Sequence, residues 1–322
     1  MILPTEISEL LARRDVTDLC LNGPGEIFFD RGRGMERLGT IPPWSEQDFR
    51  QWILSELSRC GKSWDARFPF ADATLESGHR LHASFPALGI GPILVSLRKL
   101  GSAQLGGEAR WKHQQCAFEF LKARVQEGRS VLISGSTGSG KTTLLNDLIA
   151  SVPGNQRILA LEDTKELAPH HPHFLSLLSR PRNADGFGEV TLRDLLKQTL
   201  RMRPDRIVLG ECRGSEVLEL LQLLNTGHEG AMATIHASSA RDGVRRLELL
   251  CLLAQGAEIP LRTLRELVAS GLNYVVQVKR EGIDRKIHEI LRIAGREGET
   301  LLFENCHPDR NSLEPPGRLC QN

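Results

Sequence analysis

The chain has 322 residues, of which 40% are hydrophobic and 25% charged, and its formal net charge is +1 at pH 7. This length favours about two domains, each large enough to bury a core, and the near-zero charge gives no general electrostatic reason to expect a nucleic-acid partner. The seven cysteines are scattered and never spaced as C-x-x-C, which argues against a disulfide framework and against a thiolate zinc site.

Residues 1–100 predict a small α+β domain that carries no catalytic motif of its own. Apolar residues recur at helical spacing near the N-terminus and again from Ser45 to about Leu57, where Ser45 is suited to cap the helix. Short apolar runs flank Asn22-Gly23-Pro24-Gly25, and a second pair of runs turns at Gly78. Both patterns are typical of β-hairpins.

Residues 101–112 predict a linker, because they begin with the small and uncharged stretch GSAQLGG. From residue 113 to residue 295, apolar strands alternate with helical stretches, which indicates βαβ units and a largely parallel sheet. In such a sheet, functional groups gather at the carboxyl ends of the strands. Residues 296–322 are polar and contain several prolines and glycines, so we expect a tail that is poorly ordered in part.

A phosphate-binding loop is predicted between a strand that starts at Val131 and a helical pattern that starts at Thr143. The segment matches G-x-x-x-x-G-K-[ST], in which glycines let backbone N–H groups surround phosphates. Lys141 would then lie on the β- and γ-phosphates of ATP, and the hydroxyl of Thr142 would hold Mg²⁺. The alternative is a flexible Gly/Ser loop that binds nothing. The expected nucleotide-binding residues are Gly135, Ser136, Thr137, Gly138, Ser139, Gly140, Lys141, Thr142 and Thr143.

Acidic residues follow two of the later apolar strands. Glu162 and Asp163 come directly after one strand, where a carboxylate can orient or deprotonate a water aimed at the γ-phosphate. The alternative is a capping box at a helix start, formed by Asp163 and Glu166. Glu211 follows the next such strand and could serve the metal ion or polarise the attacking water; alternatively, it only pairs with Arg213.

A histidine and several arginines complete the set of polar candidates. His236 follows an apolar strand, and a neutral imidazole there can donate to a phosphate oxygen and sense the γ-phosphate. The alternative is a structural histidine. A triphosphate also requires neutralising charge. On the residues alone, each candidate arginine is typical of a solvated surface charge: Arg80, Arg98, Arg180, Arg201, Arg203 and Arg213.

Five motifs in order resemble the secretion ATPase superfamily of type II and type IV secretion and pilus motors. They are GSTGSGKTT, LALEDTKEL, RMRPDRIVLGECRGSE, NTGHEGAMATIHASS and the intervening RPRNADGFGEVTLRDLL. The last of these, with the spacing from GECRG to NTGHEG, is most similar to the tight-adherence (CpaF-type) pilus ATPases and their conjugation relatives. The resemblance covers roughly residues 15–293.

The resemblance implies roles for individual residues. Gly135 to Thr142 match the family's Walker A motif, and Glu162 and Asp163 match its Asp box, where a glutamate is the favoured base. Glu211 matches the Walker B acid that is assigned to Mg²⁺, and His236 matches the His box. The resemblance also adds catalytic arginines from two family segments: Arg201 and Arg203 in RxRPD, and Arg80 and Arg98 in the first domain.

The resemblance further implies an α/β fold in which an N-terminal α+β domain precedes a RecA-like P-loop NTPase domain. We therefore expect a Mg²⁺-dependent ATPase that forms a homohexamer and powers a tight-adherence or type IV-like pilus, or a related secretion system. No stretch approaches the roughly 20 apolar residues that span a bilayer, so a cytoplasmic protein would reach the inner membrane through a platform protein. The alternatives are a conjugation or type IV secretion ATPase, and a nucleotide-responsive ring subunit with little turnover.

Overall fold

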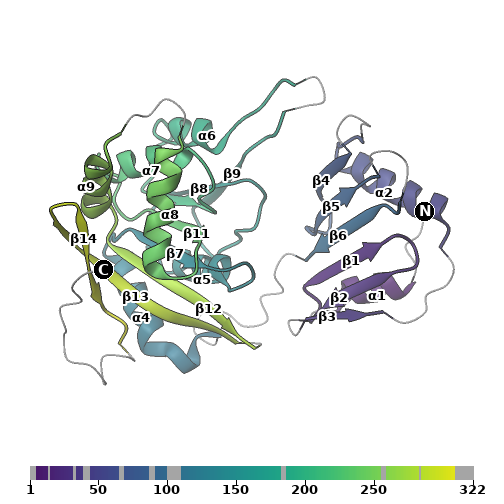
Figure 1. The fold of residues 1–322 in the computed structure, drawn as a ribbon, viewed down its shortest axis with the longest axis horizontal. Coiled ribbons are helices and arrows are strands. Elements are labelled where there is room, and N and C mark those ends of the chain that lie inside the picture. Colours follow the sequence, from purple (N-terminus) through teal and green to yellow (C-terminus); the bar gives the residue numbers. More distant parts are fainter. Residues whose placement is uncertain are drawn as a thin grey trace. The chain divides into compact units, whose positions relative to one another are not determined.

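The computed structural model describes residues 5–13, 15–31, 34–38, 44–64, 69–86, 91–99, 110–182, 186–254, 259–282 and 284–308. The chain divides into two compact units, Met1–Gln104 and Leu105–Asn322 (Figure 1). Most of the predicted linker, residues 101–109, lies outside the described residues. No helix in the described parts of the chain is both long enough and apolar enough to cross a bilayer.

The first unit is a six-stranded antiparallel sheet in the order β3-β2-β1-β6-β5-β4. Burial alternates along its central strands, so one face packs in a core with the two helices while the other face is less buried. This architecture confirms the expected α+β fold. The elements are α1 (Thr5–Ala12), β1 (Asp18–Asn22), β2 (Ile27–Asp30), β3 (Met35–Arg37), α2 (Glu46–Arg59), β4 (Phe70–Thr74), β5 (Arg80–Ser84) and β6 (Leu94–Arg98).

Helix α2 begins where the sequence predicts. The Ser45 side chain accepts a hydrogen bond from the backbone N–H of Asp48 at 3.0 Å, which satisfies one of the free donors of the first turn. The buried residues Phe49, Trp52 and Ile53 follow at helical spacing and face the core of the first unit.

The second unit is an eight-stranded sheet in the order β14-β13-β12-β7-β11-β10-β8-β9. The strands from β12 to β9 are parallel, and β12, β13 and β14 form an antiparallel edge. Its strands are β7 (Val131–Gly135), β8 (Ile158–Glu162), β9 (Phe174–Leu178), β10 (Arg206–Leu209), β11 (Met232–His236), β12 (Tyr274–Glu281), β13 (Asp284–Glu297) and β14 (Thr300–Asn305).

Helices cover both faces of this sheet (Figure 1). One buried cluster joins α4 and α5 to the sheet, and a second joins α6, α7, α8 and α9 to its other face. The central strands are buried at every position because both faces are covered. The helices are η1 (Lys112–Gln114), α4 (Gln115–Gln126), α5 (Lys141–Ile149), α6 (Leu192–Thr199), α7 (Glu216–Leu224), α8 (Ala240–Leu252) and α9 (Leu261–Gly271).

The start of the predicted tail is instead part of the sheet. Strand β14 pairs antiparallel with β13, and its partly buried Leu301 and Phe303 pack on the core. The two strands turn at Gly298, whose φ of 59° is left-handed and suits glycine. The tail was predicted from its polar residues, but two alternate apolar side chains are enough to hold an edge strand. Residues 309–322 lie outside the described residues.

Candidate nucleotide-binding site

The phosphate loop connects the central strand β7 to helix α5. Gly138 has φ 71° and Gly140 has φ 103°, so both occupy the left-handed region that favours glycine. Gly140 is also the N-cap residue of α5. The loop therefore ends with the free backbone N–H groups of a helix N-terminus, which is the arrangement that binds phosphate.

Gly135, at the end of β7, has no room for a side chain. A Cβ atom there would lie 2.4 Å from Ser139 Oγ and 2.6 Å from the backbone oxygen of Val278. The backbone oxygen cannot move without disturbing strand β12. The first glycine of the motif is therefore required by close packing rather than by its backbone angles.

We expect Gly135→Ala to destabilise the protein by about 1–3 kcal/mol, because the added methyl group overpacks this contact. Urea unfolding measured by circular dichroism would test it. Ser139→Ala is the matched control in the same loop: the Ser139 hydroxyl is buried and has no hydrogen-bond partner among the described residues, so its removal should leave stability equal or slightly higher. Equal stability of Gly135→Ala and the wild type would contradict this explanation.

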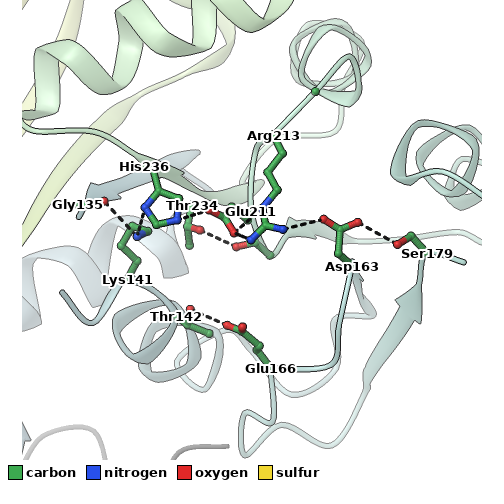
Figure 2. Close-up of polar contacts among 12 residues, drawn as sticks. Gly135, Lys141, Thr142, Asp163, Glu166, Ser179, Glu211, Arg213, Thr234 and His236 are labelled. Atoms are coloured by element: carbon green, nitrogen blue, oxygen red, sulfur yellow. Dashed lines mark hydrogen bonds and ion pairs between the residues drawn. The ribbon is translucent and has the colours of Figure 1, made fainter. Parts of the chain in front are cut away.

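Lys141 lies at the mouth of the loop and is only 7% exposed. Its ammonium group donates to the backbone oxygens of Gly135 at 3.1 Å and Ser136 at 3.0 Å, and lies 3.1 Å from His236 Nδ1 (Figure 2). Burial lowers the pKa of Lys141, and the nearby Glu211 and Glu166 carboxylates oppose that shift. The cation is therefore held by two carbonyl oxygens of the loop and by His236.

Thr142 and Glu166 meet beside Lys141. The Thr142 hydroxyl donates to Glu166 Oε2 at 3.2 Å (Figure 2). Glu166 belongs to the segment after β8, which forms no helix, so the capping-box alternative for Asp163 and Glu166 is wrong. The sequence analysis missed Glu166 as a site residue, although its position four residues beyond the strand end was a usable signal.

Glu162 is the last residue of β8 and is buried. Its carboxylate is 3% exposed and accepts hydrogen bonds from the backbone N–H groups of Glu166 and Leu167, each at 2.8 Å, and from the Ser176 hydroxyl. Burial raises its pKa, while Ser176 and the two backbone donors oppose that shift. These three bonds tie the Glu162 carboxylate to the segment that presents Glu166. The role of Glu162 as the base stays a prediction.

Glu211 is the centre of an ion-pair network at the ends of β10, β11 and β8 (Figure 2). One of its oxygens lies 2.5 Å from His236 Nε2, and the other accepts from Arg213 Nε at 2.8 Å. Arg213 also lies 3.5 Å from Asp163 Oδ2, and Asp163 accepts from the Ser179 hydroxyl at 2.9 Å. Glu211 thus pairs with Arg213, as one alternative proposed, but it also reaches His236 and through it Lys141.

The contacts of His236 indicate which ring nitrogen carries the proton. Lys141 carries only donors, so Nδ1 must accept, and the proton of the neutral ring is then assigned to Nε2, which faces Glu211. Burial and then Lys141 lower the pKa of His236, and Glu211 opposes that shift. The site therefore favours the neutral imidazole.

This preference predicts a pH dependence of stability. Because the pKa of His236 is lowered on folding from its ordinary value of about 6.5, the unfolded chain binds more protons in the window just below pH 6.5. Stability should therefore fall as the pH drops through this window. His236→Gln keeps one acceptor and one donor but does not titrate, so its midpoint of urea unfolding should fall less between pH 7 and pH 5. Identical falls in both proteins would contradict the assignment.

The predicted catalytic arginines do not gather at this site. Arg201 and Arg203 precede β10, whose opposite end leads to Glu211, so they lie at the other edge of the parallel sheet. The length of strand β10 therefore separates them from Glu211, and their catalytic role stays a prediction. Arg80 and Arg98 are paired in register in the first unit, and Arg98 donates to Asp18 at 2.9 Å. Their reach toward the nucleotide stays a prediction.

Two arginines that the sequence analysis missed lie beside the loop. A Cβ atom at Gly140 would lie 2.5 Å from Arg285 Cδ, and one at Gly138 would lie 3.9 Å from Arg280 Nη1. Burial and then the charges of Arg110 and Arg280 lower the pKa of Arg285. Antiparallel pairing of β12 with β13 brings Arg280 opposite Arg285. The sequence shows only that the ends of these two strands are basic, which does not predict that they lie beside the loop.

Residues 80–292 match the family model described as type II/IV secretion system protein. This segment is more than half of the chain and contains the phosphate loop and its neighbouring acids. The chain belongs to the type II/IV secretion system protein family. The predicted secretion ATPase superfamily is thereby confirmed, and so is its fold of an N-terminal domain followed by a RecA-like domain; membership of the tight-adherence subgroup stays a prediction.

Relatives in the type II/IV secretion system protein family cover nearly the whole chain. A putative conjugal transfer protein of Mycobacterium tuberculosis is 34% identical over 99% of this chain and 94% of its own length. The type IV secretion system protein PtlH of Bordetella pertussis is 31% identical over 87% of this chain and 91% of its own. The crystal structure of the VirB11 ATPase from the Brucella suis type IV secretion system, in complex with sulphate, matches with 27% identity and a TM-score of 0.50, covering 89% of this chain and 92% of that one.

Proposed function

We propose that the chain hydrolyses ATP in a Mg²⁺-dependent reaction and uses the energy to drive a secretion or pilus system. The observation that carries the proposal is the convergence of four side chains on the mouth of the phosphate loop: Lys141, Thr142, Glu166 and His236. They come from the first turn of α5, from the segment after β8 and from the end of β11, at the carboxyl edge of the sheet, which is where open α/β sheets bind ligands. The family membership of the chain adds independent support.

The chain's own residues would act on the triphosphate as follows. Backbone N–H groups of the loop hold the phosphates, and Lys141 stabilises the charge that develops on the γ-phosphate. Glu166 orients and polarises the attacking water, a role that Glu162 supports by holding the segment. His236 keeps Lys141 and Glu211 in place through its two ring nitrogens, and it would sense the γ-phosphate when Lys141 turns to it.

The residues fit the predicted magnesium ion. Mg²⁺ prefers oxygen ligands and is often held by one or two carboxylates together with substrate phosphates. The Thr142 hydroxyl would hold it with Glu211, and the Glu166 carboxylate lies 3.2 Å from that hydroxyl. When bound, the ion would neutralise charge on the β- and γ-phosphates.

The partners remain part of the proposal. A homohexamer, a cytoplasmic location and contact with an inner-membrane platform protein are expected from the resemblance to secretion motors. In such a ring, Arg201 and Arg203 could only serve the site of another subunit, because they lie at the opposite edge of their own sheet. The names of the relatives favour conjugation or type IV secretion, whereas the loop motif RPRNADGFGEVT favours the tight-adherence pilus.

Phosphate release from ATP by the purified full chain tests the proposal. We expect turnover that requires Mg²⁺ and is lost when the metal is chelated. Hydrolysis that DNA stimulates would favour the conjugation alternative. Assembled rings that bind ATP but release no phosphate above background would contradict the proposal and favour the regulatory alternative.

A further inference from the structure

A cavity of about 300 Å³ lies in the second unit, away from the phosphate loop. Tyr274, which lines it, pairs with Val131 at the start of β7, whereas the loop follows Gly135 at the other end of that strand. The cavity therefore lies at the amino edge of the parallel strands and takes no part in the proposed hydrolysis. Its lining residues are Arg124, Arg129, Asn273, Tyr274, Arg292 and Ile293.

The end of helix α4 brings two of the three arginines together. Gly128 has φ 84°, and its N–H donates to the Val125 oxygen at 3.1 Å, while the N–H of Arg129 donates to the Arg124 oxygen at 2.9 Å. This pair of bonds is the Schellman motif, which reverses the chain at a helix end. Because of it, Arg124 on the last turn and Arg129 after the turn line the same cavity.

The third arginine comes from a distant part of the chain. Arg292 of β13 is directly opposite Tyr274 of β12 in the antiparallel register, and the N–H of Ile293 donates to the Asn273 oxygen at 2.9 Å. Tyr274 is 7% exposed, and its ring packs edge-on against Phe120 of α4. The position of Arg292 is therefore set by sheet pairing and by a packed aromatic pair.

The lining has an excess of positive charge and an unused donor. Glu127 lies 2.7 Å from Arg124 and 3.9 Å from Arg129, and Glu304 lies 3.2 Å from Arg292. Among the described residues, two carboxylates thus pair with three guanidinium groups, which leaves one net positive charge. Arg124 Nε is buried and has no hydrogen-bond partner among the described residues, although an unsatisfied buried donor is costly.

We propose that this cavity binds a small soluble ligand through a phosphate group. A phosphoryl group carries up to two charges and three strong acceptor oxygens, and the guanidinium fork matches phosphate geometry. A ligand with a single carboxylate would bring less negative charge and fewer hydrogen-bond acceptors than a phosphate, and three arginines can bind more than it offers. The volume is at the lower end of the range for ligand pockets, so it accommodates a phosphate with a small organic part and not a polymer.

Calorimetric titration of the full chain with pyrophosphate and with glycerol 3-phosphate tests this proposal. The background is Lys141→Ala, because the phosphate loop would otherwise bind the same probes. We expect saturable binding that Arg292→Gln or Arg129→Gln weakens at least about tenfold, since each replacement removes charge-assisted hydrogen bonds. Arg129 and Arg292 are both partly exposed, so we expect each variant to fold, and circular dichroism would confirm this. Testing both keeps the experiment decisive if one of them fails to fold.

Arg182→Gln is the matched control, since it also removes an exposed arginine that pairs with a glutamate, Glu189, at 2.8 Å. It should leave binding unchanged. Three results would overturn the proposal: no saturable binding to the Lys141→Ala chain, equal binding by the cavity variants and the control, or binding only to vesicles that contain anionic lipid. Lys141→Ala weakens phosphate binding in the loop but keeps the loop's backbone N–H groups. The comparison of the cavity variants with the control therefore isolates binding in the cavity, whether or not the chain hydrolyses ATP.

Discussion

Glu166→Gln should slow ATP hydrolysis by about 10² to 10⁴-fold at saturating ATP while leaving ATP binding nearly unchanged, which is the usual contribution of a positioned acid or base. Glu166 is the carboxylate that contacts the Thr142 hydroxyl, and it lies in a segment whose backbone Glu162 holds. Glutamine keeps the size of the side chain but cannot accept a proton from water. Steady-state phosphate release and binding of a fluorescent ATP analogue would measure the two effects.

Glu162→Gln is the matched control for this experiment. Its carboxylate accepts three hydrogen bonds from Glu166, Leu167 and Ser176, and an amide has only one oxygen with which to accept them. We therefore expect Glu162→Gln to lower the unfolding temperature and Glu166→Gln to leave it unchanged. A Glu162→Gln protein that is as stable as the wild type but inactive, beside an active Glu166→Gln protein, would return the base to Glu162.

Lys141→Ala should abolish detectable turnover even at saturating ATP. Its ammonium group is the only cation that donates to the backbone oxygens of Gly135 and Ser136 among the described residues, and it lies on the first turn of α5, where phosphates would contact it. Loss of a preorganised charge at the transferred group typically costs several kcal/mol of transition-state stabilisation. The same phosphate-release assay measures the loss.

Lys197→Ala is the control for loss of a lysine, because Lys197 is an exposed residue on α6. It should keep the turnover of the wild type. Circular dichroism would establish that Lys141→Ala is folded. Wild-type hydrolysis by a folded Lys141→Ala protein would remove the phosphate loop from the reaction.

The residues whose places in the fold could be predicted are local in sequence or follow from strand order. The loop is a contiguous motif, so its glycines and Lys141 could be recognised before any fold was known. Glu211 and His236 follow β10 and β11, which are parallel neighbours, and adjacent parallel strands present their carboxyl ends at the same edge. The alternation of strands and helices predicted that arrangement directly.

The parts that were missed depend on geometry that the residue pattern does not carry. Three acids lie within five residues at Glu162, Asp163 and Glu166, and only the path of the segment decides which one faces Thr142. The cavity depends on a pairing between Tyr274 and Arg292 and on the turn after α4, which lies far from both in sequence. Periodicity predicts elements well, but it does not predict which distant side chains meet.

The central claim is that the loop and the acids after β8 and β10 act on one triphosphate. A crystal structure of the full chain with a non-hydrolysable ATP analogue and Mg²⁺ tests this claim most directly. We predict that Lys141 Nζ lies within hydrogen-bond distance of the γ-phosphate, with Glu166 and Glu211 on either side of it. A nucleotide bound in the loop with both carboxylates remote from the γ-phosphate would contradict the claim.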